Sequence, residues 1–160
     1  MTTDIDSEIG ERETVLVRNV RESDLPALVR IDAASTGRAR HEYFRILIDR
    51  AVHQSGLQVS LVAEFDQRIA GFLIASLYFG QYGIVQPTAS IDAIGVEPSL
   101  RRQRVAHALV RQLVSNLHAL GVTVIRTEAS WNEFELLGFF RSEGFVPAAR
   151  LCLERNVVVS

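Results

Sequence analysis

The sequence predicts an α/β fold, a single domain in which a central mixed, mostly antiparallel β-sheet is flanked by about four helices. The first observation behind this prediction is that segments rich in β-branched residues alternate with amphipathic segments along the whole chain. The second is size, because 160 residues, 48% of the chain being hydrophobic, suffice for one core. The third is that the sequence contains no repeat, low-complexity segment or linker that would divide it.

The first half of the sequence predicts a strand followed by two helices. Segment 14–20 is rich in β-branched residues and is expected to be the strand. Apolar residues spaced three or four apart predict one helix that begins at Ser23 and Asp24. The same spacing predicts a second helix over 38–53, ending near Gly56.

A β-hairpin and a further strand are expected next. The strand-like segments 59–65 and 68–79 flank Asp66 and Gln67, and a two-residue connection is typical of a hairpin. Segment 89–96 then predicts another strand.

The second half of the sequence predicts a long amphipathic helix over 99–120, which Gly121 ends. Segment 122–129 is expected to be a strand and segment 132–144 a short helix. Segment 145–159 is expected to hold one or two closing strands.

Composition indicates a soluble cytoplasmic protein. Residues 1–12 are acidic and polar without the apolar stretch of a signal peptide, so we expect a flexible tail before a folded domain over 13–160. No apolar run approaches the roughly 18 residues of a membrane span. The single cysteine, Cys152, cannot form an internal disulfide, which favours a reducing compartment.

Charge and residue types exclude other classes of function. A net charge of -2 provides no basic face, so nucleic acid is not expected as a partner. The four histidines are scattered and no cysteine or histidine cluster has metal-ligand spacing, so we expect no metal. Every basic residue in the Lys+Arg total is arginine.

Three arginines, Arg101, Arg102 and Arg104, fall in the expected first turn of the long helix. Each opposes the helix dipole there by about 0.3 to 1 kcal/mol. A helix N-terminus attracts phosphate, so arginines at this place suit an anion. The alternative is that the three side chains extend into solvent, which screens them.

Segment 96–109 resembles the cofactor motif of the GNAT superfamily, the acyl-CoA-dependent N-acyltransferases. The family motif is Arg or Gln, two residues, Gly, one residue, then Gly or Ala, and its backbone amides hold the pyrophosphate of acetyl-CoA. Arg101 and Ala106 match this motif, whereas Arg104 stands in place of the first glycine. We expect Arg104 in ordinary helical conformation, where its NH and its guanidinium are available to phosphate.

The segment LLGFFRSEGFVPA resembles the second signature of the family, a helix that precedes the last strands. Phe139, Phe140, Gly144 and Phe145 fit that signature. Phe140 stands where the family commonly has a tyrosine that protonates the departing thiolate. The order of elements resembles the family over nearly the whole chain.

The resemblance implies acetyl-CoA as cosubstrate and a fold of the GNAT type. The residues that it places at the cofactor are Ile94, Gly95, Val96, Arg101, Arg102, Gln103, Arg104, Val105, Ala106 and Phe140.

Two carboxylates compete for the role of general base. Asp92 lies inside a mostly apolar strand, where a carboxylate is costly to bury unless it is paired or working. Glu128 follows the next strand and precedes Phe140 by a spacing that resembles the ribosomal-protein N-terminal acetyltransferase branch. Either residue is alternatively a structural or solvated acid.

Five other side chains are expected to be structural. Tyr78 and Tyr82 are expected at packing or rim positions, although either is an alternative proton donor. Cys152 is expected to be a buried, inert thiol, with a role as proton donor as the alternative. Trp131 and Phe134 are expected to belong to the core, and the alternative is that they line the pantetheine channel or the acceptor pocket.

The resemblance implies an N-acetyltransferase in which an amine attacks acetyl-CoA directly in a ternary complex. The alternative is a noncatalytic acyl-CoA-binding sensor or regulatory module, which the departures at Arg104 and Phe140 favour. The acceptor is expected to be a small-molecule or peptide amine, and a homodimer is one option for the assembly. The family's acceptor surface corresponds here to His41, Glu42, Tyr43, Arg45 and Asp49.

Overall fold

The computed structural model describes residues 14–54 and 57–158. The tail expected over 1–12 and the helix end expected near Gly56 lie outside these residues. Contacts divide the chain into two compact units, Met1–Glu128 and Ala129–Ser160, which are described separately.

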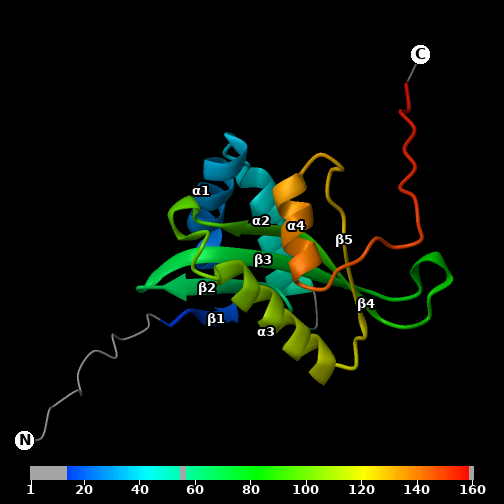
Figure 1. Ribbon diagram of the computed structural model, residues 1–160, viewed down its shortest axis with the longest axis horizontal. Helices are drawn as coiled ribbons and strands as arrows, with labels where there is room; N and C mark the ends of the chain where they lie inside the picture. Colours follow the sequence, from blue (N-terminus) through cyan, green and yellow to red (C-terminus); the bar gives the residue numbers. More distant parts are fainter. Residues whose placement is uncertain (1–13, 55–56, 159–160) are drawn as a thin grey trace, which may run out of the picture. The chain divides into compact units, whose positions relative to one another are not determined.

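The first unit is built on a five-stranded sheet in which the strands lie in sequence order (Figure 1). Its members are β1 (Leu16–Asn19), β2 (Leu61–Phe65), β3 (Arg68–Tyr78), β4 (Thr88–Val96) and β5 (Val124–Thr127). The first three pairings are antiparallel, and β4 pairs with β5 in parallel. The expected mixed, mostly antiparallel sheet is therefore confirmed.

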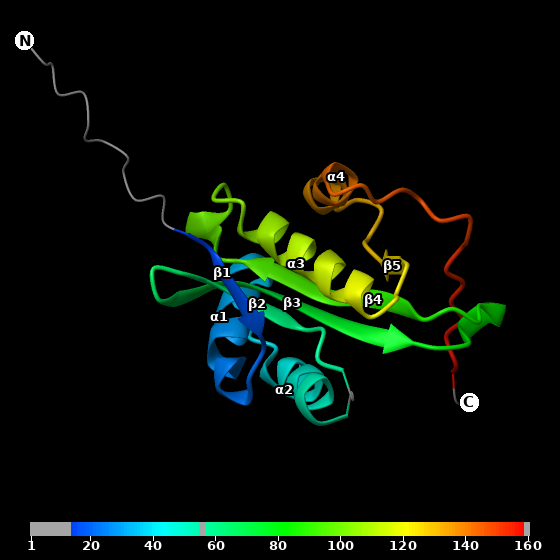
Figure 2. The same ribbon diagram turned by 90° about the horizontal axis from the view of Figure 1, so that it is seen from below.

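Helices cover both faces of this sheet, as Figure 2 shows for α1 (Leu25–Thr36) and α2 (His41–Asp49) on one face and α3 (Val105–Ala119) on the other. A π-helical turn, Arg50–Gln54, continues α2. The α1 and α2 face buries a continuous apolar cluster of Leu28, Ile31, Phe44, Leu47, Ile48, Val62, Phe72 and Ile74. Helix α3 buries Leu109, Leu113 and Leu117, one turn apart, because this spacing puts them on one side of a helix.

The expected hairpin is confirmed by the backbone of its two connecting residues. Asp66 and Gln67 have φ values of 48° and 59°. Positive φ at both central residues is the geometry of a two-residue turn whose twist matches that of the strands on either side. The turn therefore fixes which residues of β2 and β3 face one another.

The second unit contains α4 (Phe134–Ser142), which confirms the expected short helix. Phe140 is buried, and its ring lies 5.4 Å from that of Phe139 and 5.0 Å from that of Phe145 between centroids. Gly144, at φ 87°, follows the helix in the left-handed conformation that commonly ends one.

The closing strands expected over 145–159 are absent from the described part of that segment, residues 145–158. The side chains of Leu151 and Leu153 are each 87% exposed. A strand needs a neighbour that accepts and donates its ladder hydrogen bonds, and no described residue pairs with this segment in a ladder. The alternation of apolar residues was therefore not sufficient to form a strand.

The environment of three other side chains also differs from expectation. Cys152 is exposed because the segment that carries it is unpaired. Trp131 and Phe134 are 83% and 73% exposed, so neither belongs to a core.

The long helix begins later than expected. It starts at Val105, after a 3-10 turn at Pro98–Leu100 and a further turn over 101–104. The three arginines therefore precede the helix instead of forming its first turn. Their charges therefore lie in the turn before the helix and at its N-cap.

Candidate functional site

Strands β4 and β5 separate halfway along β4. Their parallel ladder runs from the pair Thr88 and Val124 to the pair Ile91 and Thr127, where β5 ends. Strand β4 continues to Val96, and no described strand pairs with its outer edge beyond Ile91. This stretch offers backbone NH and C=O groups to a ligand, because such groups otherwise need a ladder partner or water.

Asp92 occupies a β-bulge at the point of separation. On β3, the neighbours Ile74 and Ala75 pair with Ala93 and Ile91 of β4, so Asp92 is the extra residue between them. The Ser76 hydroxyl donates a hydrogen bond to Asp92 Oδ2. Bulges reorient side chains next to functional sites, and this one turns a carboxylate toward the α1 and α2 face.

Glu128 lies one residue beyond the last pair of the β4 and β5 ladder, as Asp92 does on β4. It is exposed, and it forms no hydrogen bond or ion pair with another described residue. Asp92 is half-buried. The two candidate bases thus each come directly after the last ladder pair, on adjacent strands. Asp92 is half-buried there, and Glu128 is exposed.

The loop before α3 is connected to α1 by side-chain contacts. Arg101 Nη2 donates to Ser35 Oγ at 3.0 Å. Arg30 of α1 forms an ion pair with Glu97, whose backbone N donates to Ala70 O at 2.7 Å. These contacts fix where β4 ends and the arginine loop begins.

Arg104 is left-handed, with φ 59° and ψ 23° at the N-cap of α3. The expectation of ordinary helical conformation is therefore wrong. An L-residue other than Asn or Asp rarely adopts this region, and glycine adopts it freely. The left-handed backbone at this position explains why the GNAT motif has a glycine there. Arginine adopts the same conformation only with strain.

The remaining residues expected at the cofactor divide between the two units. Residues 94–96 lie on β4, residues 101–104 form the loop, and Val105 and Ala106 begin α3, so these form one continuous strand, loop and helix start in the first unit. Phe140 belongs to the second unit. Gly95 has a packing role as well, because a Cβ there would lie 2.7 Å from the Phe72 ring.

Three residues in contact between α1 and α2 were not among the expected catalytic or cofactor residues. Asp32, which is buried, accepts from Arg40 Nε at 2.8 Å and from Arg40 Nη2 at 2.6 Å. The Arg40 guanidinium carbon lies 4.7 Å from the centroid of the Tyr43 ring. The sequence contained one sign of this cluster: Asp32 lies on the apolar side of α1 with Leu28 and Ile31, where a carboxylate needs a partner.

The pKa of Tyr43 is raised above its ordinary value. The main cause is burial, which disfavours the phenolate; Arg40 opposes the shift, and the charges of Asp92 and Asp32 add to it. The hydrogen bond to Asp32 raises the pKa of Arg40, which stays charged. Tyr43 is therefore a neutral hydroxyl at physiological pH.

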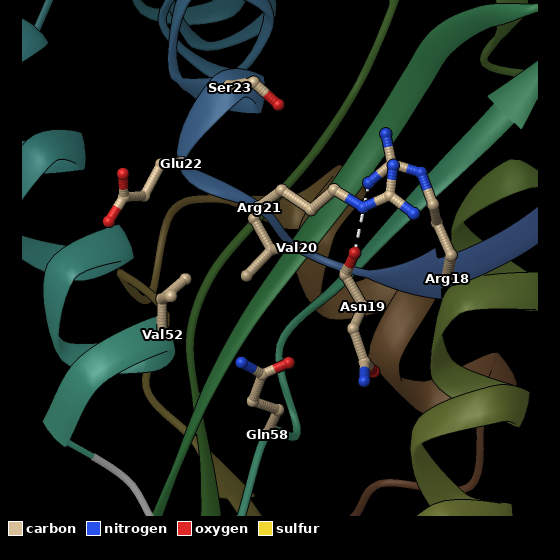
Figure 3. A pocket seen from close by; sticks show the side chains of 8 residues that line it. All are labelled: Arg18, Asn19, Val20, Arg21, Glu22, Ser23, Val52 and Gln58. Carbon is tan, nitrogen blue, oxygen red and sulfur yellow. Dashed lines mark hydrogen bonds between the residues drawn. The ribbon is translucent and has the colours of Figure 1, made fainter.

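A hollow in the described surface lies at the opposite edge of the sheet, beside β1 (Figure 3). It measures about 660 Å³, and its lining includes Arg18, Arg21 and Gln58. Arg18 Nη1 donates to the Asn19 carbonyl at 3.0 Å. None of the expected site residues lines this hollow.

The described residues, 14–54 and 57–158, provide neither a membrane-spanning helix nor a metal-binding cluster. They contain no helix that is long and apolar enough to cross a membrane. Within the same residues, no group of three or more His, Cys, Asp or Glu is placed to hold a metal ion.

Comparison with protein families gives one match. The model described as "Acetyltransferase (GNAT) family" matches residues 25–145. No curated protein sequence matches the chain.

Solved structures resemble the chain over most of its length. Aminoglycoside antibiotic 6'-N-acetyltransferase AAC(6')-Ih from Acinetobacter baumannii is 18% identical with a TM-score of 0.75, over 91% of this chain and 100% of that chain. Aminoglycoside N-acetyltransferase AAC(6')-Iy in complex with CoA is 17% identical with a TM-score of 0.75, over 89% and 95%. Ard1 from Thermoplasma volcanium is 21% identical with a TM-score of 0.70, over 84% of each chain. At these identities the likeness demonstrates a shared fold.

Proposed function

The chain belongs to the acetyltransferase (GNAT) family, and from this premise we propose that it transfers the acetyl group of acetyl-CoA to a primary amine within a ternary complex. The observation that carries the proposal is the continuous run in which the unpaired edge of β4 leads through a cationic loop to the start of a 15-residue helix. A helix start and arginines together suit the pyrophosphate of the cofactor. The mechanism, the amine and the use of acetyl-CoA are parts of this proposal.

In the proposed cofactor site, backbone groups form the hydrogen bonds to acetyl-CoA and arginine side chains supply the positive charge. The edge of β4 over residues 94–96 binds the pantetheine arm through backbone groups, as an added strand would be bound. The first amides of α3 have no acceptor within the helix, so they are available to phosphate oxygens. Arg101 and Arg102 supply positive charge beside them.

In the proposed reaction, the amine nitrogen attacks the thioester carbonyl carbon, a C–N bond forms and the C–S bond breaks. Asp92 accepts the proton that the amine loses, directly or through water, because its half-buried carboxylate has one oxygen, Oδ1, without a hydrogen bond to a described residue. Glu128 is the alternative base. Water protonates the departing thiolate, since the phenyl ring of Phe140 has no donor.

The acceptor stays open between small-molecule and peptide amines. Two of the structurally similar proteins are aminoglycoside acetyltransferases, which supports amino sugars as one class to test. A cytoplasmic location, a homodimer and the absence of nucleic-acid and membrane partners stay predictions.

The competing proposal is a noncatalytic acyl-CoA sensor, which the strained Arg104 and the missing hydroxyl at Phe140 favour. Calorimetric titration with acetyl-CoA, followed by release of free CoA thiol in the presence of an amine panel, separates the two. Binding with turnover supports the enzyme, and binding without turnover on any amine supports the sensor. If acetyl-CoA does not bind, both proposals fail.

The proposed base is tested by Asp92→Asn. We expect kcat to fall about 100-fold and the acidic limb of its pH profile to change, because general base catalysis contributes roughly that factor or more. Asp66→Asn, which removes the same charge from the hairpin turn, should leave kcat unchanged. If Asp92→Asn keeps the kcat of the unmodified protein and Glu128→Gln lowers it, Glu128 is the general base.

A further inference from the structure

Hydroxyl side chains on both sides of the bulge in β4 hold the backbone around it. Where the ladder of β2 and β3 ends, the buried Ser60 hydroxyl continues it, because it accepts from Ala75 N at 3.0 Å and donates to Ala75 O at 3.1 Å. On the other side, Thr127 Oγ1 donates to Ile91 O at 3.1 Å. Ala75 and Ile91 are themselves paired across β3 and β4. The backbone that carries the bulge is therefore fixed from β2 to β5.

Ser76 of β3 lies on the same face of the sheet as the Asp92 carboxylate. It follows Ile74 by two residues, and alternate residues of a strand share a face. Ile74 belongs to the apolar cluster beneath α1 and α2, so Ser76 stands on that face, half-buried, where the cluster ends along β3. It pairs directly with Ser90 of β4. Its hydroxyl donates to Asp92 Oδ2 across the bulge.

The two oxygens of the Asp92 carboxylate are therefore not equivalent. Oδ2 accepts from a donor on a fixed strand, whereas Oδ1 forms no hydrogen bond with any residue that the structure describes. Rotation of the carboxylate would break the bond from Ser76, so this bond sets the direction of Oδ1. A general base acts only within hydrogen-bond reach of the proton that it accepts, which makes this direction a condition for the reaction.

A serine suits this task because its hydroxyl is a neutral donor. It fixes the carboxylate without placing a positive charge beside it, and a nearby cation would stabilise the charged form and weaken the base. None of the described arginines forms an ion pair with Asp92. Orientation and charge at this carboxylate are thus controlled separately.

We propose that Ser76 is a positioning residue for the transfer reaction: it holds Oδ2 of Asp92 and thereby directs Oδ1 to the amine. The proposal rests on the acetyltransferase function proposed above, with Asp92 as the base, and it adds a residue to that same site. Ser76 acts through Asp92 and has no role toward the cofactor, which is assigned to residues 94–106. Loss of its hydroxyl should therefore lower kcat and leave the KM for acetyl-CoA unchanged.

The rate test compares two serines that face one another. Release of CoA thiol is measured with sisomicin, leucinamide and spermidine as amines. Ser76→Ala should lower kcat about tenfold, because a misdirected base loses much of its effect. Ser76→Thr keeps the donor and should restore most of the rate. Ser90→Ala, the same substitution on the paired residue of the same face, should leave kcat unchanged.

Three results of this comparison would overturn the proposal. They are an unchanged kcat in Ser76→Ala, an equal loss of kcat in Ser90→Ala, and a Ser76→Thr variant that is as slow as Ser76→Ala. The first result would mean that the orientation of Asp92 does not limit the reaction. The second and third would mean that the hydroxyl of Ser76 has no specific role.

A second test needs no substrate. The urea midpoints of Ser76→Ala, Asp92→Ala and the double variant show whether the two side chains interact. We expect the loss in the double variant to be smaller than the sum of the single losses, because both single changes remove the same hydrogen bond. Ser90→Ala combined with Asp92→Ala is the control and should be additive.

The two tests together separate this inference from the proposed function. Additive losses for Ser76 and Asp92 would overturn the positioning role. If an amine is acetylated and Ser76→Ala keeps its kcat, the positioning role alone fails. If the losses are not additive but none of the amines is acetylated, the proposed function fails and the positioning role fails with it.

Discussion

The arginines on the α1 and α2 side of the sheet and those in the loop before α3 have opposite surroundings. Arg18 is held by Asp24 and Glu64, and Arg40 by Asp32. Residues Arg101, Arg102 and Arg104 are exposed and form no ion pair with any residue described in the structure. The comparison teaches that the first set stabilises the fold, whereas the second set is available to an anion that the protein does not itself supply.

The largest effect is expected where a paired arginine loses its partner. Asp24 is 3% exposed and accepts from Arg18 Nη1 and Nη2 and from the Arg21 backbone N, at 2.8 to 2.9 Å. Asp24→Asn should lower the free energy of unfolding by about 2 kcal/mol, because a buried site loses the charge that accepts three hydrogen bonds, and the half-buried Arg18 keeps only its ion pair with Glu64. Denaturation with urea measures this loss.

An exposed ion pair provides the control for Asp24. Glu42 and Arg45 form a bidentate pair on the surface of α2. Glu42→Gln should leave the urea midpoint unchanged, since solvent screens exposed pairs. Equal destabilisation by both variants would show that burial does not distinguish these arginines.

An intermediate effect on acetyl-CoA affinity is expected when the arginines of the loop are replaced. Replacing Arg101 and Arg102 together by Ala should weaken acetyl-CoA binding about tenfold and flatten its salt dependence, because two charge-assisted contacts are lost. Calorimetry at several salt concentrations measures both quantities. Arg111→Ala, which removes an exposed arginine from the middle of α3, is the control, and a loss of the same size there would contradict a local phosphate site.

The smallest effect is expected from Arg104, where backbone strain and side-chain charge can be separated. Arg104→Gly should raise the free energy of unfolding by about 0.5 to 1 kcal/mol, because glycine adopts φ 59° without strain. Arg104→Ala loses the same guanidinium but keeps a Cβ, so it should not be stabilised. Thermal unfolding of the two variants side by side measures the difference, and equal midpoints would place the effect in the charge.

Much of the fold was predictable where the signal is local. The connection at Asp66 and Gln67 and the apolar spacing of α1, α2 and α3 each specify their own geometry. The start of α3 was predicted too early in the chain, because arginine rarely adopts a left-handed backbone and its presence at residue 104 therefore gives no sign of one. Segment 145–158 was misassigned because strand formation depends on a partner edge, which the segment's own sequence does not encode.

The candidate site was predicted unevenly for the same reason. Asp92 and the arginine loop were found because a carboxylate in an apolar strand and a charge cluster are visible in sequence. The cluster of Asp32, Arg40 and Tyr43 depends on how α1 and α2 pack against each other. A signal for the bulge was present, since Ile91 and Ile94 are three residues apart where a regular strand would alternate every second residue.

Because Asp92 is the extra residue of the bulge, a mutation that inserts or deletes one codon can add or remove this carboxylate without shifting the rest of the strand. Ile91 and Ala93 are already paired with the consecutive residues Ala75 and Ile74, so removing the codon for Asp92 would join two positions that are in register. Ile91, Ala93 and Ile94 would then alternate between the two faces without interruption. A one-codon deletion would thus abolish the candidate base and leave a regular strand, so the chemistry of this chain and its scaffold can evolve separately at this position.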